Sequence, residues 1–223
     1  MNGTVLVTGA TGFLGGHLAR DLAAHGSEVR GLGRNTGRGL QLEADGVSFF
    51  PVDLSNREAL RRACRGADVV VHAAALSSAW ATRSAYRRVN VDGTAAVLGA
   101  AQAAGVGRIV HISTPAVLSR FADQFDLTEE EPIPAVHISD YGASKAAAER
   151  LVSAVSAVET VIVRPKAIYG PGDTALLPRL VGAATRGRLR IVGHGDTMTH
   201  LTHVSDVVRA LRPILPALPC VTR

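Results

Sequence analysis

The sequence predicts an α/β protein with a doubly wound parallel sheet. Strand-like and helix-like hydrophobic patterns alternate along most of the chain, which is typical of this fold class. Hydrophobic residues make up 47% of the chain and aromatic residues only 4%. The core must therefore consist mainly of Val, Leu, Ile and Ala, which suits a buried parallel sheet covered by helices. A length of 223 residues fits one large domain with a small appendage.

The first strand and the first helix enclose a glycine-rich turn. An apolar run at residues 5–7 leads into Gly9, Gly12 and Gly15, and a helical pattern begins at Phe13. Gly9 allows a sharp turn, Gly12 lets the backbone approach a pyrophosphate, and Gly15 lets the helix pack closely on the strand. Unpaired N–H groups at the helix N-terminus favour an anion there. The turn predicts a dinucleotide-binding loop, with a ligand-free glycine turn as the alternative.

The later elements follow in the same alternating order. Strands are expected at residues 28–33, 47–52, 68–73, 108–113 and 160–163, and helices at 57–64, 82–104 and 141–158. Ser55 is expected to cap the helix at 57–64, and the polar, proline-bearing stretch 119–138 is expected to be a loop.

The pattern changes beyond Gly170. A helix is expected from 173 to 186, a short strand at 190–192 and a helix at 204–215. Because proline interrupts both helix and strand, the three prolines of 213–223 predict a frayed tail. We therefore expect a dinucleotide-binding domain at 1–165, a partial substrate-binding lobe at 166–212 and a tail at 213–223.

Composition bears on partners and location. The formal net charge of +5 comes from arginine, since Lys145 and Lys166 are the only lysines. The arginines are scattered over several expected helices and loops, which argues against nucleic-acid binding, although a basic balance suits an anionic cofactor. Cys64 and Cys220 have neither metal-ligand nor disulfide-framework spacing, and no segment resembles a leader or a membrane span. A soluble, cytoplasmic protein without nucleic-acid or membrane partners is expected.

Three histidines near the C-terminal end, at 194, 200 and 203, could suggest a metal site. They match no ligand motif that includes a catalytic acid, so no metal is expected.

A second motif lies on the helix expected at 141–158. Tyr141 and Lys145 are four residues apart, so their side chains lie on one helical face. An ammonium group near a phenol favours the phenolate and lowers the pKa of the phenol. The strand expected at 108–113 ends in Ser113 and Thr114, at the sheet edge where α/β proteins bind ligands. A surface pair of Tyr and Lys is the alternative for the motif alone.

Taken together, these motifs resemble the extended short-chain dehydrogenase/reductases, also called the NAD-dependent epimerase/dehydratase family. Within that family the sequence is most similar to the 3β-hydroxysteroid dehydrogenase-like reductases, and the resemblance extends to about Ala210. It rests on Thr8-Gly-Ala-Thr-Gly-Phe-Leu-Gly15, Asp53-Leu54, His72-Ala-Ala-Ala75, Val89-Asn-Val-Asp-Gly-Thr94, His111-Ile-Ser-Thr-Pro-Ala-Val117, Tyr141-Gly-Ala-Ser-Lys145, Arg164-Pro165, Tyr169-Gly-Pro171 and His203-Val-Ser-Asp206.

The resemblance implies a Rossmann fold and a role for each matching residue. Tyr141 would be the general acid/base, and Lys145 would lower its pKa and hold the nicotinamide ribose. Thr114 would bond the substrate oxygen, with Ser113 as its fallback. A carbonyl polarised by Thr114 would take a hydride from the nicotinamide and a proton from Tyr141. The implied cofactor-binding residues are Gly9, Thr11, Gly12, Phe13, Leu14, Gly15, Arg34, Asp53, Leu54, Ala73, Ala74, Ala75, Asn90, Tyr141, Lys145, Pro165, Lys166 and Ile168.

Three departures from the family pattern refine these expectations. Gly33 stands where an acidic residue would bond the ribose 2′-OH, and Arg34 follows it, so NADP(H) is favoured and NAD(H) is possible. Arg38 would assist Arg34, and a merely solvated Arg34 is the alternative. Thr199 replaces the arginine that clamps a nucleotide-sugar diphosphate, which favours an uncharged or lipid-like ketone or alcohol. Family members usually continue well beyond the position where this sequence ends, which puts activity in question.

The sequence thus predicts an NAD(P)-dependent oxidoreductase that interconverts a ketone and a secondary alcohol. A nucleotide-sugar epimerase or dehydratase with bound NAD is the second hypothesis, and a non-catalytic dinucleotide-binding protein is the third. Asn90 would shape the active site from the long helix or serve as a buried structural residue. The helices beginning at Thr82 and Tyr141 resemble those that pair in family dimers, so a homodimer is expected.

Overall fold

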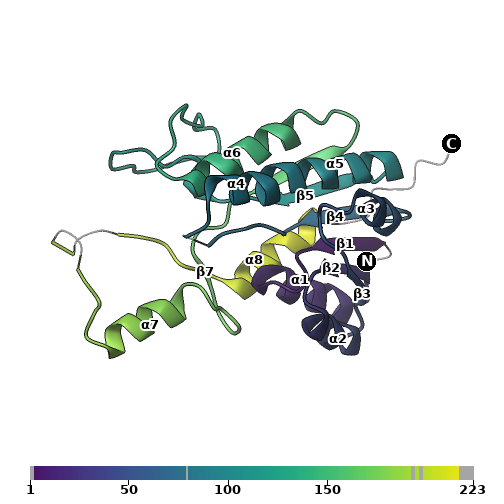
Figure 1. Cartoon of the computed structure of the whole chain (residues 1–223), viewed down its shortest axis with the longest axis horizontal. Coiled ribbons are helices and arrows are strands. Elements are labelled where there is room, and N and C mark those ends of the chain that lie inside the picture. Colours follow the sequence, from purple (N-terminus) through teal and green to yellow (C-terminus); the bar gives the residue numbers. More distant parts are fainter. Residues whose placement is uncertain (1–2, 79, 192–193, 196–197, 216–223) are drawn as a thin grey trace.

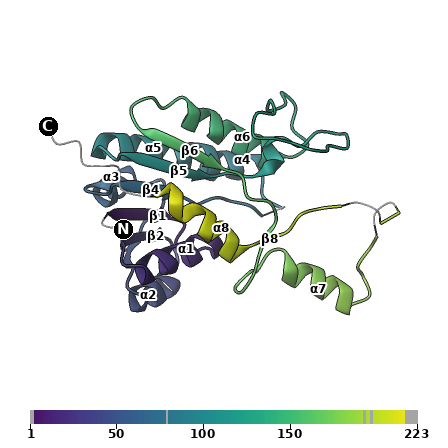
Figure 2. The same ribbon diagram turned by 180° about the vertical axis from the view of Figure 1, so that it is seen from behind.

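A parallel sheet forms the centre of the molecule. The computed structural model describes residues 3–78, 80–191, 194–195 and 198–215. Within these residues, six parallel strands pair in the order β3-β2-β1-β4-β5-β6 (Figures 1 and 2). The strand order reverses beside β1, which is where doubly wound sheets bind their ligands. The predicted fold class is confirmed. The strands are β1 (Thr4–Thr8), β2 (Glu28–Gly33), β3 (Ser48–Pro51), β4 (Val69–His72), β5 (Arg108–Ile112) and β6 (Glu159–Val163).

Helices cover both faces of the sheet (Figure 1). One apolar cluster joins the sheet to α1, α2 and α8, and the other joins it to α3, α5 and α6. The α-helices are α1 (Phe13–Ala24), α2 (Thr36–Ala44), α3 (Arg57–Cys64), α4 (Arg83–Tyr86), α5 (Gly93–Ala104), α6 (Asp140–Ser153), α7 (Leu177–Thr185) and α8 (Val204–Leu211).

The central strands contain continuous apolar runs because both of their faces are covered. Val5 and Val7 of β1 pack in one cluster, while Leu6 between them packs in the other. The side chains of β4 divide in the same way, with Val70 on the opposite face from its two neighbours. Successive residues of a strand point to opposite faces, so a sheet covered twice needs continuous apolar runs.

The long helix predicted at 82–104 is present with a local irregularity. Thr82 caps α4, and a π-helical segment at Arg87–Asp92 connects α4 directly to α5. The helix ends at Gly105, whose φ of +71° is the left-handed conformation that glycine adopts most easily. Helix α6 is shorter than predicted, since it ends at Ser153 rather than at 158.

Several local predictions are wrong. The cap of α3 is Asn56, whose Oδ1 accepts a hydrogen bond from the Ala59 N–H at 3.0 Å. Ser55 instead donates its hydroxyl to Asp53 at 2.7 Å. Helix α2 was not predicted because its glycines obscure the helical pattern. One of them, Gly39, leaves room for the Phe49 ring, which an added Cβ would approach within 2.2 Å.

The strand predicted at 190–192 is also wrong for its described residues, since Arg190 and Ile191 lie outside any strand and residue 192 is not described. A separate two-stranded sheet forms instead between β7 (Ile168–Tyr169) and β8 (Thr202–His203). Each strand has only two residues, which is too short to leave a periodic pattern in the sequence.

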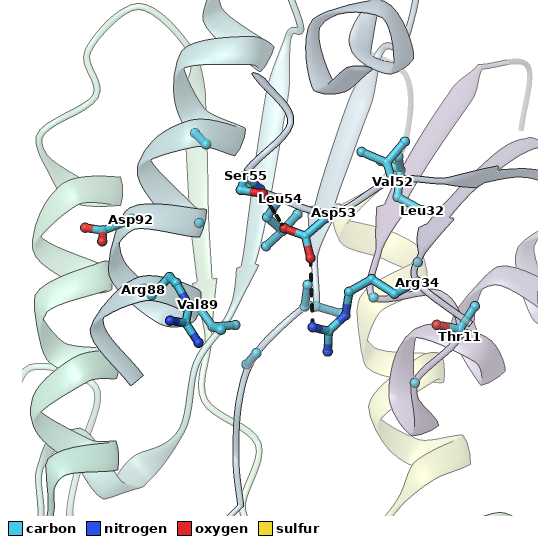
Figure 3. Close-up of a pocket in the computed structure, with 18 of the residues that line it drawn as sticks. Thr11, Leu32, Arg34, Val52, Asp53, Leu54, Ser55, Arg88, Val89 and Asp92 are labelled. Carbon is cyan, nitrogen blue, oxygen red and sulfur yellow. Dashed lines mark hydrogen bonds and ion pairs between the residues drawn. The ribbon is translucent and has the colours of Figure 1, made fainter. Parts of the chain in front are cut away.

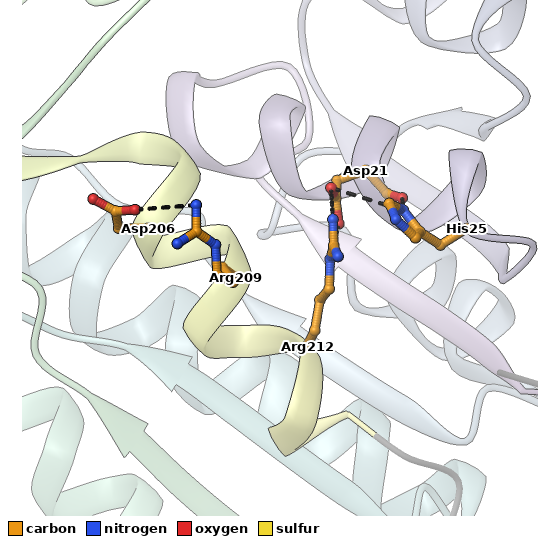
Figure 4. A network of polar contacts seen from close by, with 5 residues as sticks. All are labelled: Asp21, His25, Asp206, Arg209 and Arg212. Atoms are coloured by element: carbon orange, nitrogen blue, oxygen red, sulfur yellow. Dashed lines mark hydrogen bonds and ion pairs between the residues drawn. The ribbon is translucent and has the colours of Figure 1, made fainter.

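Helix α8 packs against α1, far from it in the sequence. Val204, Val207, Val208 and Leu211 are buried in the same cluster as the apolar face of α1. Arg212 donates from Nε to Asp21 Oδ2 at 2.7 Å, which ties the end of α8 to α1 (Figure 4). A helix from the expected substrate lobe is therefore part of the packing that supports the sheet.

The expected frayed tail is wrong at its start. Residues Arg212–Ile214 form a 3-10 turn, and Leu215 is 2% exposed. Residues 216–223 lie outside the described part of the chain. The domain division at residue 165 stays a prediction. Among the helices that the structure describes, none has both the length and the hydropathy needed to cross a membrane.

The packing of α8 can be tested with Leu211→Ala. Leu211 is fully buried, so its truncation should lower the free energy of unfolding by about 2–5 kcal/mol. Arg209→Ala, on the exposed side of the same helix, should change it by less than about 0.5 kcal/mol. Both values come from denaturant unfolding, and equal effects from the two variants would contradict the assignment of α8 to the core.

Candidate active site

The glycine turn between β1 and α1 is tightly packed. Gly9 has a φ of +73°, and a Cβ added there would lie 2.8 Å from the backbone of Ala74. A Cβ on Gly15 would lie 2.3 Å from the carbonyl oxygen of Gly9. Gly12 is the N-cap of α1 and supplies no side-chain hydrogen bond to the first turn. The N–H groups at this helix end therefore suit an anionic group, and the turn fits the pyrophosphate of a dinucleotide.

A cavity of about 760 Å³ opens beside this turn, at the carboxyl ends of β1, β2 and β4. Figure 3 shows Arg34 and Arg88 facing each other across it, with Asp53 and Leu54 between them. The structure brings nine predicted cofactor-binding residues together here: Gly9, Thr11, Gly12, Arg34, Asp53, Leu54, Ala73, Ala74 and Ala75.

Sequence reasoning missed the helical wall of the cavity. Arg88, Val89, Asp92 and Ala96 line it from the π-helical segment and α5. Positions 88, 92 and 96 lie on one helical face, because four residues make about one turn. That spacing was visible in the sequence, but no chemistry marked the stripe as functional. Leu32, Val52, Ser55, Arg57 and Gly93 also line the cavity.

Packing explains why no acidic residue ends β2. A Cβ at Gly33 would lie 2.4 Å from the Thr11 hydroxyl oxygen, so an aspartate could not fit while Thr11 keeps its position. Arg34 follows, with its Nη1 3.8 Å from Asp53 Oδ2 and its side chain 77% exposed. Arg38 Nη1 donates to the carbonyl of Thr11, which lines the same cavity, at 3.0 Å. Its assistance to Arg34 stays a prediction.

Asp53 is held in its ionised form. Hydrogen bonds from the Ser55 backbone and hydroxyl, with help from the positive charges of Arg34 and Arg88, keep the pKa of Asp53 below its ordinary value. Asp53 is thus an ionised carboxylate placed between two of the arginines that line the cavity.

Tyr141 lies at the start of α6, where Ser139 caps the helix by accepting from the Gly142 N–H at 3.1 Å. Its ring centre is 5.9 Å from that of the buried Tyr86. Burial raises the pKa of the Tyr141 hydroxyl, and the neighbouring Thr114 hydroxyl opposes this rise. Thr114, directly after β5, thus lies beside Tyr141 as the sequence predicts, although the roles of both residues stay predictions.

Ser113, the predicted fallback for Thr114, is turned into the protein. It is 5% exposed, and its backbone N–H donates to the Val163 carbonyl at 2.7 Å. Its hydroxyl has no hydrogen-bond partner among the described residues.

Lys145 extends from α6 into the interior of the protein. The side chain is buried, with 2% exposure, and its Nζ donates to the Ile112 carbonyl at 2.7 Å and to His111 Nε2 at 3.1 Å. Burial lowers the pKa of Lys145 to about 8, although the charge of Glu149 opposes this shift. Within the described residues Lys145 makes no hydrogen bond to Tyr141. The expected lowering of the tyrosine pKa is not observed, since the pKa of Tyr141 is raised.

A chain of buried hydrogen bonds begins below the glycine turn. Thr8 Oγ1 lies 2.7 Å from His72 Nδ1, and His72 Nε2 lies 2.9 Å from Thr94 Oγ1. Because Thr94 donates its hydroxyl proton to the Asn90 carbonyl at 2.6 Å, it must accept from His72 Nε2–H. In a neutral imidazole, His72 Nδ1 then accepts from Thr8. Burial agrees with this, lowering the pKa of His72 to about 3.

Asn90 continues the chain from the π-helical segment. Its Nδ2 donates to the Leu76 carbonyl at 3.0 Å and to Ser144 Oγ at 2.9 Å, and its Oδ1 accepts from the Leu76 N–H at 2.7 Å. Ser144 Oγ donates to the Tyr141 carbonyl at 2.7 Å. Asn90 therefore positions both the loop after β4 and the tyrosine helix. It does not line the cavity, and its contact with a cofactor stays a prediction.

The other predicted cofactor-binding residues do not line this cavity. Phe13 and Leu14 belong to the first turn of α1, below the glycine turn. Pro165 lines a second cavity, of about 540 Å³, together with residues of β6 and α8. Lys166 is exposed, and Ile168 packs against the apolar core. The predicted contacts of these residues with a cofactor stay predictions.

The C-terminal histidines show no metal-binding arrangement in the described part of the chain, which contains no group of three or more suitable side chains. His203 Nδ1 lies 2.7 Å from Ser205 Oγ, and its ring centre is 5.2 Å from that of Tyr169. This histidine is engaged in local packing.

A family model described as the NAD dependent epimerase/dehydratase family matches residues 5–218. The chain belongs to this family. The matched residues include the glycine turn and the residues that line the cavity, and the predicted resemblance is confirmed.

Relatives within the epimerase/dehydratase family include named reductases. The chain is 41% identical over 195 residues to the 4-hydroxy-2-methyl-3-oxo-4-farnesyl-3,4-dihydroquinoline-1-oxide ketoreductase of Stigmatella aurantiaca, an overlap covering 86% of this chain and 58% of the relative. It is 40% identical to the 2-alkyl-3-oxoalkanoate reductase of Stenotrophomonas maltophilia (strain K279a), with the same coverage. The chain thus spans little more than half the length of these relatives.

Solved structures show the same fold with a bound dinucleotide. The dTDP-glucose 4,6-dehydratase DesIV of Streptomyces venezuelae, solved with NAD bound, matches with a TM-score of 0.83 and 32% identity. The match covers 93% of this chain and 70% of the dehydratase.

The glycine turn can be tested with Gly15→Ala. The added methyl must displace the Gly9 carbonyl, which should weaken NAD(H) and NADP(H) binding by about tenfold or more, because overpacking of this kind costs about 1–3 kcal/mol. Gly99→Ala is the matched control, since a Cβ there meets open space within α5. Cofactor fluorescence titration measures both variants, and full affinity in Gly15→Ala would contradict the assignment of this turn.

Proposed function

We propose that this chain carries the cofactor-binding and proton-transfer part of an NADP(H)-preferring oxidoreductase that interconverts an apolar ketone and a secondary alcohol. The observation that carries the proposal is the position of the Thr114 hydroxyl beside Tyr141 at the carboxyl edge of the sheet. This pair lies at the same edge as the glycine-lined cavity, so a dinucleotide and a carbonyl compound could bind side by side.

The dinucleotide would supply the hydride when bound. The chain's own residues would handle the substrate oxygen and its proton. Thr114 would donate a hydrogen bond to the carbonyl oxygen, which polarises the carbonyl group. Tyr141 would then donate its proton to the oxygen as negative charge develops there. Burial raises the pKa of Tyr141, so the hydroxyl is protonated around neutral pH and carries the proton that ketone reduction consumes.

The preference for NADP(H) is supported by the end of β2. The expected carboxylate is absent, and Thr11 fills the space that it would need. Arg34 has an exposed guanidinium at the rim of the cavity, and a planar guanidinium pairs well with a phosphate. The solved relatives hold NAD, so NAD(H) stays the alternative.

An apolar substrate is supported by the relatives and by the surface. Both named reductases act on oxo compounds, one of them farnesylated and the other alkylated. In this chain, Trp80 is 88% exposed, Phe121 85% and Phe125 81%, and all three lie in the connections that follow β4 and β5. Thr199 stands in place of the diphosphate-clamping arginine.

A nucleotide-sugar dehydratase or epimerase is the second candidate, favoured by the structural likeness to DesIV. NAD that copurifies with the protein, together with thermal stabilisation by a nucleotide sugar, would support it instead. A non-catalytic dinucleotide-binding role is the third candidate. A homodimer formed through the long helix and α6, and a cytoplasmic location, remain part of our proposal.

The proton donor is tested by Tyr141→Phe. Ketone reduction with NADPH should fall by about 10²–10⁴-fold, because the phenyl ring has no proton to donate. The affinity for NADPH should stay within about twofold, since the ring itself is retained. A ketone panel that includes alkyl and isoprenoid substrates provides the assay. Parent protein that binds NADPH but consumes none with any substrate would favour the non-catalytic candidate.

The cofactor preference is tested by Arg34→Gln. The affinity for NADPH should fall by about tenfold through loss of a charge-assisted hydrogen bond, whereas the affinity for NADH should stay nearly constant. Arg57→Gln is the matched control, because Arg57 lines the same cavity from α3. Titration of both variants with both cofactors gives four comparisons. Equal losses for NADH and NADPH in Arg34→Gln would contradict the 2′-phosphate assignment.

A further inference from the structure

The floor of the candidate site contains two buried imidazoles that the proposed reaction does not use. His72 is 1% exposed and His111 is fully buried, and their ring centres are 5.3 Å apart. His111 is in contact with Lys145, whose Nζ lies 3.1 Å from His111 Nε2. The chain therefore places a histidine directly against the buried lysine of the Tyr141 motif.

The direction of this hydrogen bond follows from the chemistry of the two groups. A protonated lysine has three donors and no lone pair, so His111 Nε2 must be the acceptor. The proton of the neutral imidazole then resides on Nδ1, which has no partner among the described residues. Burial and the positive charge of Lys145 both lower the pKa of His111, which is consistent with a neutral ring.

The acidic residue nearest to Lys145 in the sequence cannot replace His111 as the hydrogen-bond acceptor of the ammonium group. Glu149, one turn after Lys145 on α6, is held by Arg164 from the end of β6 in a bidentate pair at 3.0 and 2.7 Å. Its charge raises the pKa of Lys145, but both carboxylate oxygens are engaged by the guanidinium. The hydrogen bonds that Lys145 makes in this structure go to His111 and to the Ile112 carbonyl, at 3.1 and 2.7 Å.

We propose that His111 is a positioning residue for Lys145: its Nε2 and the Ile112 carbonyl fix the ammonium group on β5, and one N–H remains for a ligand above the sheet. The participation of Lys145 in the reaction rests on the proposed function, but its attachment to His111 does not. His111 would act through the lysine and would not touch the substrate.

The chain offers a direct measurement because Lys145 and Lys166 are its only lysines. Protein labelled with ¹⁵N-lysine therefore gives two side-chain Nζ signals by NMR, and the Lys166→Arg background leaves the signal of Lys145. In this background the Nζ signal should titrate near pH 8, as burial of the ammonium requires.

The test variant is His111→Leu in the same background. It removes the acceptor from the charged form, so the pKa of Lys145 should fall by about one further unit, a tenfold shift in the protonation equilibrium. His111→Gln should restore most of the parent value, because its side-chain carbonyl can accept the same hydrogen bond. Val110→Ala is the matched control, since Val110 is fully buried on the same strand but its side chain lies on the opposite face of the sheet from His111.

Cofactor binding supplies a second readout. If the free N–H of Lys145 binds the dinucleotide, NADPH affinity should decrease as the pH rises through the pKa of Lys145. This decrease should begin about one pH unit lower in His111→Leu than in the parent.

A folded His111→Leu protein with an unchanged Lys145 titration would overturn the proposal. Should His111→Leu fail to fold, a comparison of His111→Gln with His111→Asn replaces it, since the shorter Asn amide cannot reach Nζ. Equal titrations of Lys145 in the Gln and Asn variants would then contradict the proposal. These titrations need no substrate, so a failed ketone assay would reject the proposed function and leave this result intact.

Discussion

The candidate site depends on the buried hydrogen-bond chain that starts at Thr8 and passes through His72, Thr94 and Asn90 to Ser144. It joins the ends of β1 and β4 to the long helix and to α6, so it connects the glycine turn to the helix that carries Tyr141. Every link is buried, and a buried polar group that loses its partner destabilises the fold by about 1–3 kcal/mol. These hydrogen bonds therefore fix the position of the glycine-lined cavity relative to Tyr141.

The same network explains the irregular long helix. The π-helical segment at Arg87–Asp92 contains Asn90, whose amide bonds the backbone of Leu76 on one side and Ser144 on the other. A π-bulge changes the direction of the following side chains relative to a regular α-helix. The segment also presents Arg88 and Asp92 to the cavity. A single helical irregularity thus supports the floor of the candidate site and forms part of the cavity wall.

Burial shifts the pKa values of the titratable groups in the site more than pairing with opposite charges does. Burial raises the pKa of Tyr141 and lowers those of Lys145 and His72. Each shift favours the neutral form, as desolvation requires. Lys145 retains its ammonium at neutral pH because its pKa of about 8 still lies above that range. The floor of the site is consequently a place where one positive charge is surrounded by neutral hydrogen-bond partners.

The sequence by itself determined the parallel sheet, the glycine turn and the positions of Thr114 and Tyr141, because these depend on local patterns: apolar runs, glycine spacing and residues at strand ends. Only the tertiary structure decided where Lys145 points, that Thr11 excludes a carboxylate at Gly33, and that α8 packs on α1. Each of these depends on a contact between residues far apart in the chain, for which one sequence contains no periodic signal. The Asn56 cap and α2 were missed for different reasons. Ser55 and Asn56 are adjacent and both residue types cap helices, so the sequence did not distinguish them. The glycines of α2 obscured its helical pattern.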